Sequence, residues 1–552
     1  MKLRCALVLL LFSSLPAFAQ SWTIKLDKDI RFYQTTEMGI VIAGTEKSLY
    51  AIDGESGQIL WRRKDTSLDE TDVAPVPGTD LLLLSFEKGD KARIEAVDVL
   101  TGDSIWRSEK IKGAVMQTSV DTANNLLAVV LAKDAKNRAR DGFKRRPLLH
   151  VLDLASGDEL WKYEASEVEM MPARWLEDSD KEVDYTLDNY YPPVFVDGRL
   201  YVFYEGVTSF DARNGKERLR EKYRVNEDGL ALTEAQPIFS EDFIYVSGHG
   251  RVRAISRQSG DTEWEAKDLG LTPEMILVGD VLYVRTGGQF TRLKDGEIVE
   301  RGSYGVSAID ARSGKVLWRY KGADKGITNL LLPARNTIAI ADRDDLIFID
   351  ASNGKRTSRV SHKIERPSFG LLNERGDIVI GGQNEIAAFS GGRELWRARH
   401  TPPGRGILRT IGAIAARAAS LYFRFSGPGM TAFRTVSAFS NLQSLATLAT
   451  RNRRPPPLAR FNRYGIASRQ LDRLSRFLWH RERLATVRGQ WMYFYTSLDS
   501  GGNGLAGVNV NNGRTDREVR LSDLDERFIT DEVLGSMITA SGDRLFSRGL
   551  NR

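Results

Sequence analysis

Cysteine is nearly absent from this chain of 552 residues, which contains only Cys5. That residue precedes the apolar stretch 6–12, in a segment with the composition of a removable leader. The mature chain is therefore expected to contain no thiol, which excludes disulfides, thiol catalysis and the Cys-x-x-Cys-His site of a c-type haem. A lipoprotein anchor is not expected either, because its cysteine would follow the apolar stretch.

Long hydrophobic runs are also missing. The chain opens with a positively charged start, the short apolar stretch and a small-x-small cleavage site at Ala17-Phe18-Ala19. This pattern predicts a signal peptide over residues 1–19 and a mature protein that is periplasmic or secreted. No later stretch approaches about eighteen uncharged apolar residues, so we expect a soluble protein without a transmembrane segment after cleavage.

Histidine is scarce and scattered, with no pair spaced as a zinc-binding helix requires. Gly-x-Ser-x-Gly and Gly-x-x-x-x-Gly-Lys are both missing, so neither a hydrolase elbow nor a phosphate loop is expected. The acidic stretch 177–189 supplies oxygen ligands that suit calcium, but it lacks the glycine and terminal glutamate of an EF-hand loop, which favours a solvated loop. We therefore predict no catalytic residue, no metal site and no cofactor.

What the sequence does contain is a repeat. A full copy begins with a small or apolar residue, any one residue and an Asp. A Gly follows the Asp after three residues, and a Trp follows the Gly after three more. Strong copies are AIDGESGQILW at 51–61, AVDVLTGDSIW at 96–106, VLDLASGDELW at 151–161 and AIDARSGKVLW at 308–318. Weaker copies begin at 209, 254 and 348, and degenerate ones lie at 387–396 and 507–515. The spacing of the copies suits the blades of a β-propeller, which need about 40–50 residues each.

Each part of the repeat has a mechanical meaning. Apolar alternation before the Asp predicts a strand, the Asp side chain accepts hydrogen bonds from the backbone ahead of it, and the Gly supplies the positive φ of a tight turn. The residues that end at the Trp form the returning strand, and an upstream apolar run such as 199–204 adds another. The repeat therefore predicts an all-β fold with one antiparallel sheet of about four strands per copy.

Six tryptophans occupy the same position of the repeat. At this position the sequence resembles the tryptophan-docking propellers of the pyrroloquinoline-quinone-like repeat family, well over about residues 30–400 and loosely over 490–552. The resemblance implies an eight-bladed ring whose blades are tied together by these side chains, although nine copies are visible. Trp22 has the pattern of an isolated outer strand, which predicts that the N-terminus completes the last blade. The six predicted docking residues are Trp61, Trp106, Trp161, Trp264, Trp318 and Trp396.

Different classes of function are compatible with this resemblance. Some members are quinone-dependent dehydrogenases, often with a vicinal Cys-Cys pair that this mature chain lacks. The chain is also similar to the propeller component of the outer-membrane β-barrel assembly machinery, which presents ring loops to partner proteins. We favour a non-catalytic scaffold that binds envelope proteins, with a dehydrogenase as the alternative. A surface-carbohydrate-binding module is a further alternative, suggested by the aromatic residues Tyr185, Tyr190 and Tyr191.

Residues 401–490 differ from the rest of the chain in charge. They contain sixteen arginines, no lysine and two acids, a net charge of +14 against +6 for the whole chain. Apolar residues at three-and-four spacing predict helices over 407–425 and 466–486. This basic, helical insertion is expected either to pack on the propeller rim or to contact an anionic partner such as a membrane surface; nucleic acid is not expected in an exported protein. The residues predicted to make that contact are Arg405, Arg409, Arg417, Arg424, Arg451, Arg453 and Arg454.

These features divide the chain into four parts. Residues 1–19 are the signal peptide, 20–400 the propeller blades, 401–490 the arginine-rich insertion and 491–552 the final blade with ring closure. The N-terminal strand is expected to meet the C-terminal part, since the pattern around Trp22 places it in the last blade.

Overall fold

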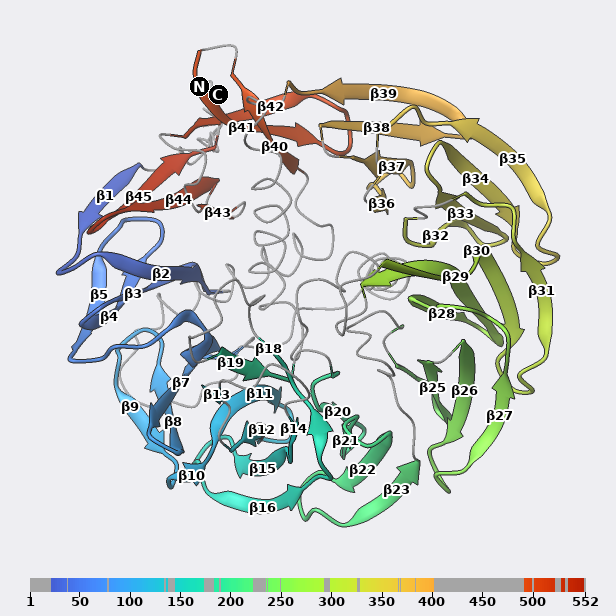
Figure 1. Ribbon diagram of the computed structural model, residues 1–552. Coiled ribbons are helices and arrows are strands. Elements are labelled where there is room, and N and C mark those ends of the chain that lie inside the picture. The colour runs from blue at the N-terminus through green and yellow to red at the C-terminus, as the bar shows by residue number, and fades with distance from the viewer. Residues whose placement is uncertain are drawn as a thin grey trace, which may run out of the picture.

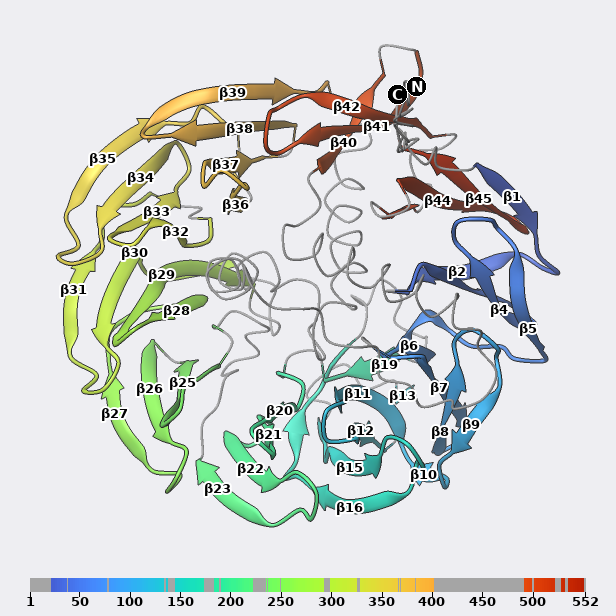
Figure 2. The same ribbon diagram turned by 180° about the vertical axis from the view of Figure 1, so that it is seen from behind.

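The fold is described from a computed structural model, which covers residues 21–401 and 491–550 apart from short gaps. The gaps are 37, 77–78, 134–135, 138–143, 173–182, 188–189, 222–234, 236, 249, 292–297, 325–327, 366, 368, 383, 499–500, 522–527 and 532–534. Figures 1 and 2 show that the described strands form a ring of antiparallel sheets, in which β1 lies beside β45.

The ring has ten sheets arranged as propeller blades. The all-β propeller predicted from the repeat is confirmed, whereas the eight blades implied by the family resemblance are wrong. Within the described residues the one helical element is a turn of 3-10 helix, η1 (Glu70–Asp72), and all other elements are strands. The predicted helices over 407–425 and 466–486 lie outside the described residues.

Blades 1 to 8 each begin with an inner strand and end with an outer fourth strand. Blade 1 consists of β2 (Ile30–Thr35), β3 (Ile40–Thr45), β4 (Ser48–Asp53) and β5 (Ile59–Lys64), and blade 2 consists of β6 (Val73–Pro75), β7 (Leu81–Lys88), β8 (Lys91–Asp98) and β9 (Ser104–Arg107), with β10 (Ile111–Lys112) beside β8. Blade 3 consists of β11 (Ala114–Asp121), β12 (Leu126–Ala132), β15 (Leu148–Asp153) and β16 (Glu159–Glu164), and blade 4 consists of β20 (Val194–Val196), β21 (Arg199–Val202), β22 (Val207–Asp211) and β23 (Glu217–Glu221). Blade 5 consists of β24 (Ile238–Phe239), β25 (Phe243–Gly248), β26 (Arg251–Ser256) and β27 (Thr262–Ala266), and blade 6 consists of β28 (Glu274–Val278), β29 (Val281–Thr291), β30 (Ile298–Asp310) and β31 (Val316–Tyr320). Blade 7 consists of β32 (Leu331–Ala334), β33 (Thr337–Ala341), β34 (Asp345–Asp350) and β35 (Arg356–Ser361), and blade 8 consists of β36 (Phe369–Leu372), β37 (Ile378–Gly381), β38 (Glu385–Ser390) and β39 (Arg393–Arg399).

Two small sheets stand apart from the blades. They arise from the connection between β12 and β15 and from the one between β16 and β20. One contains β13 (Lys136–Asn137), β18 (Met171–Pro172) and β19 (Val183–Thr186), and the other contains β14 (Lys144–Arg145) and β17 (Val168–Glu169).

The last two blades explain why nine copies of the repeat give ten blades. Blade 9 has three described strands, and blade 10 combines C-terminal strands with β1 (Trp22–Lys25), which pairs antiparallel with β45 so that Trp22 lies opposite Ser547. This pairing confirms the predicted closure by the N-terminal strand. Each copy of the repeat marks the turn between the third and fourth strands, and blade 10 has no such turn because its fourth strand comes from the other end of the chain. The remaining strands are β40 (Trp491–Ser497), β41 (Asn503–Asn509) and β42 (Thr515–Arg520) in blade 9, and β43 (Phe528–Asp531), β44 (Ser536–Ser541) and β45 (Arg544–Gly549) in blade 10.

The repeat builds the same local turn from blade to blade. In blade 1, Asp53 Oδ1 accepts a hydrogen bond from the backbone N–H of Ser56 at 2.8 Å, and Gly57 adopts a φ of 73°. A register shift next to this turn pairs Ala51 with Trp61. Because Ala51 is small, the large indole beside it has room to extend from the sheet toward the neighbouring blade.

The hydrophobic core is divided among the blade junctions. Each of the ten clusters of buried apolar residues joins two neighbouring blades. Between blades 1 and 2, for example, Ile42 and Leu49 belong to the same cluster as Leu82 and Val97. Strands such as β12 are continuously apolar and buried because both faces of a blade are covered by its neighbours.

Replacing Gly102 by alanine should destabilise the ring through the junction between blades 1 and 2. Gly102 has a φ of 77°, and a Cβ atom there would lie 2.8 Å from the ring of Trp61. Backbone strain and displacement of the indole together should lower the free energy of unfolding by about 2–3 kcal/mol, measured by urea denaturation.

Gly89→Ala is the matched control, because Gly89 also has a positive φ, of 64°, but no atom lies within 4 Å of its Cβ position. It should lose only the backbone term of about 1 kcal/mol. Equal losses in the two variants would contradict the importance of the contact between Gly102 and Trp61.

Candidate functional site

Five of the six predicted docking tryptophans bridge to the next blade through a hydrogen bond. The indole Nε1 donates to the carbonyl oxygen of the residue that follows the turn-starting Asp, and the ring covers the turn glycine of that blade. The bonds are Trp61 to Val99 at 2.9 Å, Trp106 to Leu154 at 2.7 Å, Trp161 to Ala212 at 2.9 Å, Trp264 to Ala311 at 3.0 Å and Trp318 to Ala351 at 3.1 Å.

Two further tryptophans occupy equivalent junctions. Trp22 of β1 donates to the carbonyl oxygen of Gly54 at 3.0 Å and joins blade 10 to blade 1; it was absent from the predicted docking set, although its strand pattern was recognisable. Trp396 covers Gly513 of blade 9, but its buried Nε1 has no hydrogen-bond partner within the described ranges. Seven of the ten junctions therefore contain a tryptophan.

In blades 6 and 8 the residue after the tryptophan reaches the opposite way, to the preceding blade. Arg319, next to Trp318, donates to the carbonyl oxygen of Asp268 at 3.1 Å, beyond the outer strand of blade 5. Arg397, next to Trp396, donates in the same manner to the carbonyl oxygen of His362, beyond blade 7. Because successive side chains of a strand point to opposite faces, each of these two Trp-Arg pairs connects three blades.

Asp27 holds the closure between blades 10 and 1. Its carboxylate accepts hydrogen bonds from the hydroxyl groups of Thr45 at 2.8 Å and Ser48 at 2.7 Å, and it forms an ion pair with Arg62. Burial raises the pKa of Asp27, but the hydrogen bonds from Ser48, Thr45 and Tyr50 and the charge of Arg62 outweigh it and lower the pKa to about 2. The ionised carboxylate is thus stabilised by groups that only the closed ring brings together.

Among the strands that the structure describes, three junctions lack the tryptophan. The strand register places Leu219, Ser358 and Arg517 where other blades have it. Between blades 4 and 5, Arg257 of blade 5 forms an ion pair of 2.7 Å with Asp197 of blade 4. An ionic contact thus connects blades 4 and 5, whose junction has no docking indole.

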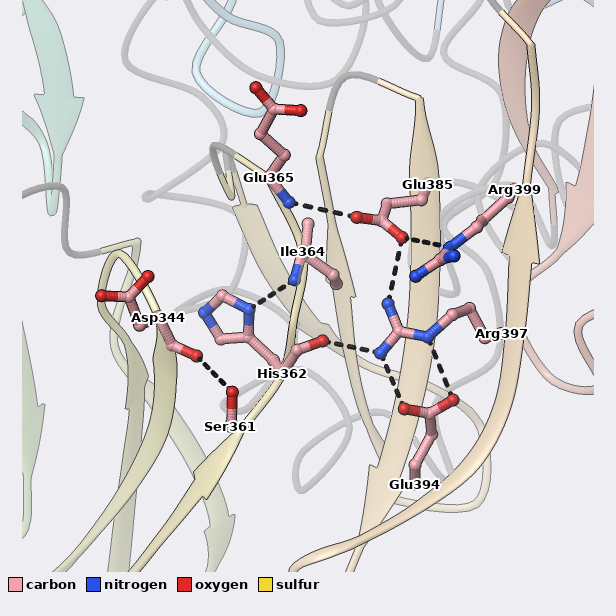
Figure 3. A network of polar contacts seen from close by, with 9 residues as sticks. All are labelled: Asp344, Ser361, His362, Ile364, Glu365, Glu385, Glu394, Arg397 and Arg399. Atoms are coloured by element: carbon pink, nitrogen blue, oxygen red, sulfur yellow. Dashed lines mark hydrogen bonds and ion pairs between the residues drawn. The ribbon is translucent and has the colours of Figure 1, made fainter.

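The junction between blades 7 and 8 contains a larger polar network, shown in Figure 3. Arg397 of β39 forms ion pairs with Glu385 at 3.1 Å and Glu394 at 2.7 Å while it donates to the carbonyl oxygen of His362. Glu385 also accepts a hydrogen bond from the backbone N–H of Glu365 at 3.1 Å. The network therefore ties blade 8 to the segment that follows the outer strand of blade 7.

His362 itself is fully buried, with both ring nitrogens in use. Its Nδ1 accepts from the backbone N–H of Ile364 at 3.0 Å, so Nε2 carries the proton and donates to the carbonyl oxygen of Asp342 at 3.0 Å. Both contacts are to backbone groups at the junction. The arrangement supports a structural role for this histidine rather than proton transfer to a substrate.

The two faces of the ring differ in the connections they carry. The turns between first and second strands and between third and fourth strands share one face, the short-turn face, as bonds such as Gly54 N–H to Gly39 O show. None of these connections exceeds five residues within the described part of the chain. The opposite face, the long-connection face, carries both small sheets and the connections after β16, β23 and β39.

The seven arginines predicted to contact an anionic partner lie outside the described residues. The aromatic residues that suggested carbohydrate binding are placed differently from that suggestion: Tyr185 and Tyr191 are only 3% and 4% exposed and belong to the cores beside blade 4. These two rings are thus not available as a sugar-stacking platform. The sequence pattern could not show whether Tyr185 and Tyr191 are buried or exposed, because a short aromatic run has the same pattern in a buried and an exposed loop.

No group of three or more acidic, histidine or cysteine side chains within the described ranges is arranged to hold a metal ion. Most of the acidic stretch 177–189 falls in the gaps between those ranges. Among the described residues, no helix is long and apolar enough to cross a membrane.

The repeat and the ring geometry agree with a comparison against protein families. The model described as "Outer membrane protein assembly factor BamB" matches overlapping segments at 19–173, 89–266, 149–301 and 302–450, which together span most of the chain. The chain belongs to this family. Among curated proteins, no sequence matches it.

Solved structures similar to the chain include members of both classes considered above. BamB from Moraxella catarrhalis is 16% identical, with a TM-score of 0.33 and coverage of 68% of this chain and 97% of that one. The quinohemoprotein alcohol dehydrogenase ADHIIG from Pseudomonas putida HK5 is 12% identical, with a TM-score of 0.32 and coverage of 85% and 92%. At these scores the likenesses do not distinguish between the classes.

Replacing Asp27 by asparagine should weaken ring closure at neutral pH and have little effect near pH 2. Because the folded-state pKa of about 2 lies below the unfolded value of about 3.9, the carboxylate adds stability above about pH 4 that is lost as pH falls through the folded pKa. We expect a loss of about 1 kcal/mol at pH 7, after allowance for solvent screening, in urea unfolding.

Asp29→Asn is the control, because Asp29 is exposed and lies on the same segment. It should change stability little at any pH. A loss in Asp27→Asn that does not shrink between pH 7 and pH 2 would show that charge at Asp27 is not what holds the closure.

Proposed function

We propose that this protein is an exported, non-catalytic scaffold at the cell envelope, and that partner proteins bind its long-connection face. The observation that carries this proposal is the difference between the two faces. A ring held together only by its repeats needs connections of a few residues, and the connections on the short-turn face are of this length. Additions confined to the other face are typical of a binding surface on a rigid support.

The small sheets beside blades 3 and 4 supply one described part of this surface. Lys136–Asn137 pairs with Val183–Asp184, and Lys144–Arg145 pairs with Val168–Glu169, so the connections before β15 and after β16 are joined by backbone hydrogen bonds. The buried Tyr185 anchors this region to the core between blades 3 and 4. A structured addition of this kind can present side chains in a fixed geometry, which limits the entropy lost on binding.

The basic segment 401–490 supports a second contact, with an anionic surface. Its net charge of +14 is local, because the rest of the chain is acidic. The chain leaves β39 on the long-connection face, where Thr401 O accepts a hydrogen bond from the N–H of Ser497 at 3.2 Å. A concentration of uncompensated arginines attracts anionic lipid headgroups or acidic proteins, and salt screens that attraction.

Site-specific photo-crosslinking in living cells would test the scaffold. A photoreactive residue at Lys133, exposed on the long-connection face of blade 3, should yield crosslinks to discrete envelope proteins. The same residue at Ala155, exposed on the short-turn face of the same blade, is the control and should yield few. Equal crosslinking from both positions, or reduction of a dye by the purified protein with calcium, quinone and an alcohol, would contradict the proposal.

Vesicle binding would test the basic segment. The mature chain should bind vesicles that contain anionic phospholipid, and binding should weaken as the Debye length falls from about 30 Å at 0.01 M salt to about 8 Å at 0.15 M. Replacing Arg451, Arg453 and Arg454 together by serine should weaken binding at low salt. As the control with the same charge change, replacing three exposed lysines of blade 2 (Lys88, Lys110 and Lys112) should leave it unchanged. Equal effects would indicate that total charge, and not this segment, attracts the vesicles.

A further inference from the structure

The outer strands of blades 6, 7 and 8 carry an unusual charge. The windows that begin after the turn glycine, 315–321, 355–361 and 393–399, contain nine lysines and arginines and a single acid, Glu394. We call these three windows the basic wall. They lie next to one another along the perimeter, where Figure 1 shows β31, β35 and β39 in succession.

The same windows have the opposite sign elsewhere on the ring. In blades 2, 3 and 5, residues 103–109, 158–164 and 261–267 contain eight acids and three cations. Structural demands at these positions are alike, since each window forms an outer strand. The sign of the charge is therefore not a requirement of blade packing.

Most cations of the basic wall are exposed, and several have no acidic partner among the described residues. Arg359, Arg397 and Arg399 form ion pairs with acids of blades 7 and 8. Four others are exposed and form no ion pair within the described ranges; these are Lys315, Lys355, Arg356 and Arg393. Such an excess creates a positive potential over the wall.

Cations of the wall and of the adjacent segment act on the carboxyl group of Glu394. A hydrogen bond from Arg397, together with the charges of Arg397, Lys363 and Arg399, outweighs burial and lowers the pKa of its carboxyl group. A carboxylate placed on the wall is thus stabilised in its ionised form by more than one cation. Further carboxylates brought by a partner would meet the same field.

Two large apolar side chains are exposed within the basic wall. Leu317 of β31 is 45% exposed and Leu395 of β39 is 50% exposed, the two highest values among the large hydrophobic residues described. Both precede a junction tryptophan, and the corresponding Leu60 in blade 1 is better covered. The wall therefore combines cations with apolar contact area at the perimeter of the ring.

We propose that the basic wall, residues 315–321, 355–361 and 393–399, binds an acidic polypeptide segment that carries leucine-like side chains. Each of β31, β35 and β39 ends its sheet, so within the described residues one edge of its backbone has no strand beside it and can bond to a peptide. A membrane surface fits less well, because the half-covered leucines lie on strands of a convex perimeter and the wall exposes no aromatic anchor.

This inference rests on the proposed scaffold function and names the chemistry of one partner. A fluorescent peptide in which glutamates alternate with serines and two leucines is the probe, titrated against the full mature chain at low salt. Lys355→Glu with Arg356→Glu should weaken binding by about tenfold or more, because attraction is replaced by repulsion at exposed sites. Lys110→Glu with Lys112→Glu, the same charge change on blade 2, should leave affinity unchanged.

The leucines are tested separately. Leu317→Ser with Leu395→Ser should weaken peptide binding severalfold without changing net charge, since each loses apolar contact with the peptide. Ile59→Ser is the control, because Ile59 is 38% exposed on the outer strand of blade 1. Thermal unfolding of each variant shows whether the ring remains intact. If the variant with Lys355→Glu and Arg356→Glu unfolds, Lys315→Glu with Arg393→Glu takes its place.

Several outcomes would overturn the proposal. One is equal loss of affinity in the wall and blade 2 variants; another is a wall variant that loses binding to anionic phospholipid vesicles while it keeps peptide binding. Peptide binding that depends on Arg451, Arg453 and Arg454 instead of the wall would overturn it as well. If the photoreactive residue at Lys133 yields no crosslinks but the basic wall binds the peptide, only the proposed long-connection binding face is contradicted. If Lys133 yields crosslinks but the basic wall does not bind the peptide, only the proposal for the basic wall is contradicted.

Discussion

The ring depends on the contact between a tryptophan on one blade and a glycine turn on the next. A blade is a sheet with two apolar faces, so it can be stable only when neighbours cover both. The indole adds a directional contact to this burial, because it covers the turn glycine and donates to the carbonyl group beside it. Any side chain at Gly102 would compete with Trp61 for the same space.

The junctions without a tryptophan show what can replace it. Between blades 4 and 5 an Arg257–Asp197 ion pair spans the junction, and between blades 7 and 8 Arg397 donates to the carbonyl oxygen of the buried His362. Charged contacts at a surface contribute less than a buried indole, and salt and pH change them. The ring therefore combines junctions held mainly by apolar burial with junctions that also depend on ionisation.

The proposed binding surfaces lie away from the face whose turns receive the docking indoles. The short-turn face is occupied by the turns that receive the indoles, and additions there would disturb docking. The small sheets lie on the opposite, long-connection face, and the basic wall lies on outer strands that also carry the docking residues Trp318 and Trp396. Exposed residues at these places can differ in charge while the docking residues beside them keep their contacts.

The sequence alone determined the all-β propeller, the strand-turn-strand unit and the N-terminal closing strand, because these depend on local patterns: alternation, an Asp-to-Gly turn and a tryptophan at fixed spacing. It did not determine the number of blades, since a closing blade assembled from both chain ends has no turn to count. Tertiary structure decided that Tyr185 and Tyr191 are buried. It also decided that Lys315, Lys355 and Arg393 lie on three consecutive blades. Burial and charge density depend on which strands become neighbours, and only the closed ring sets that.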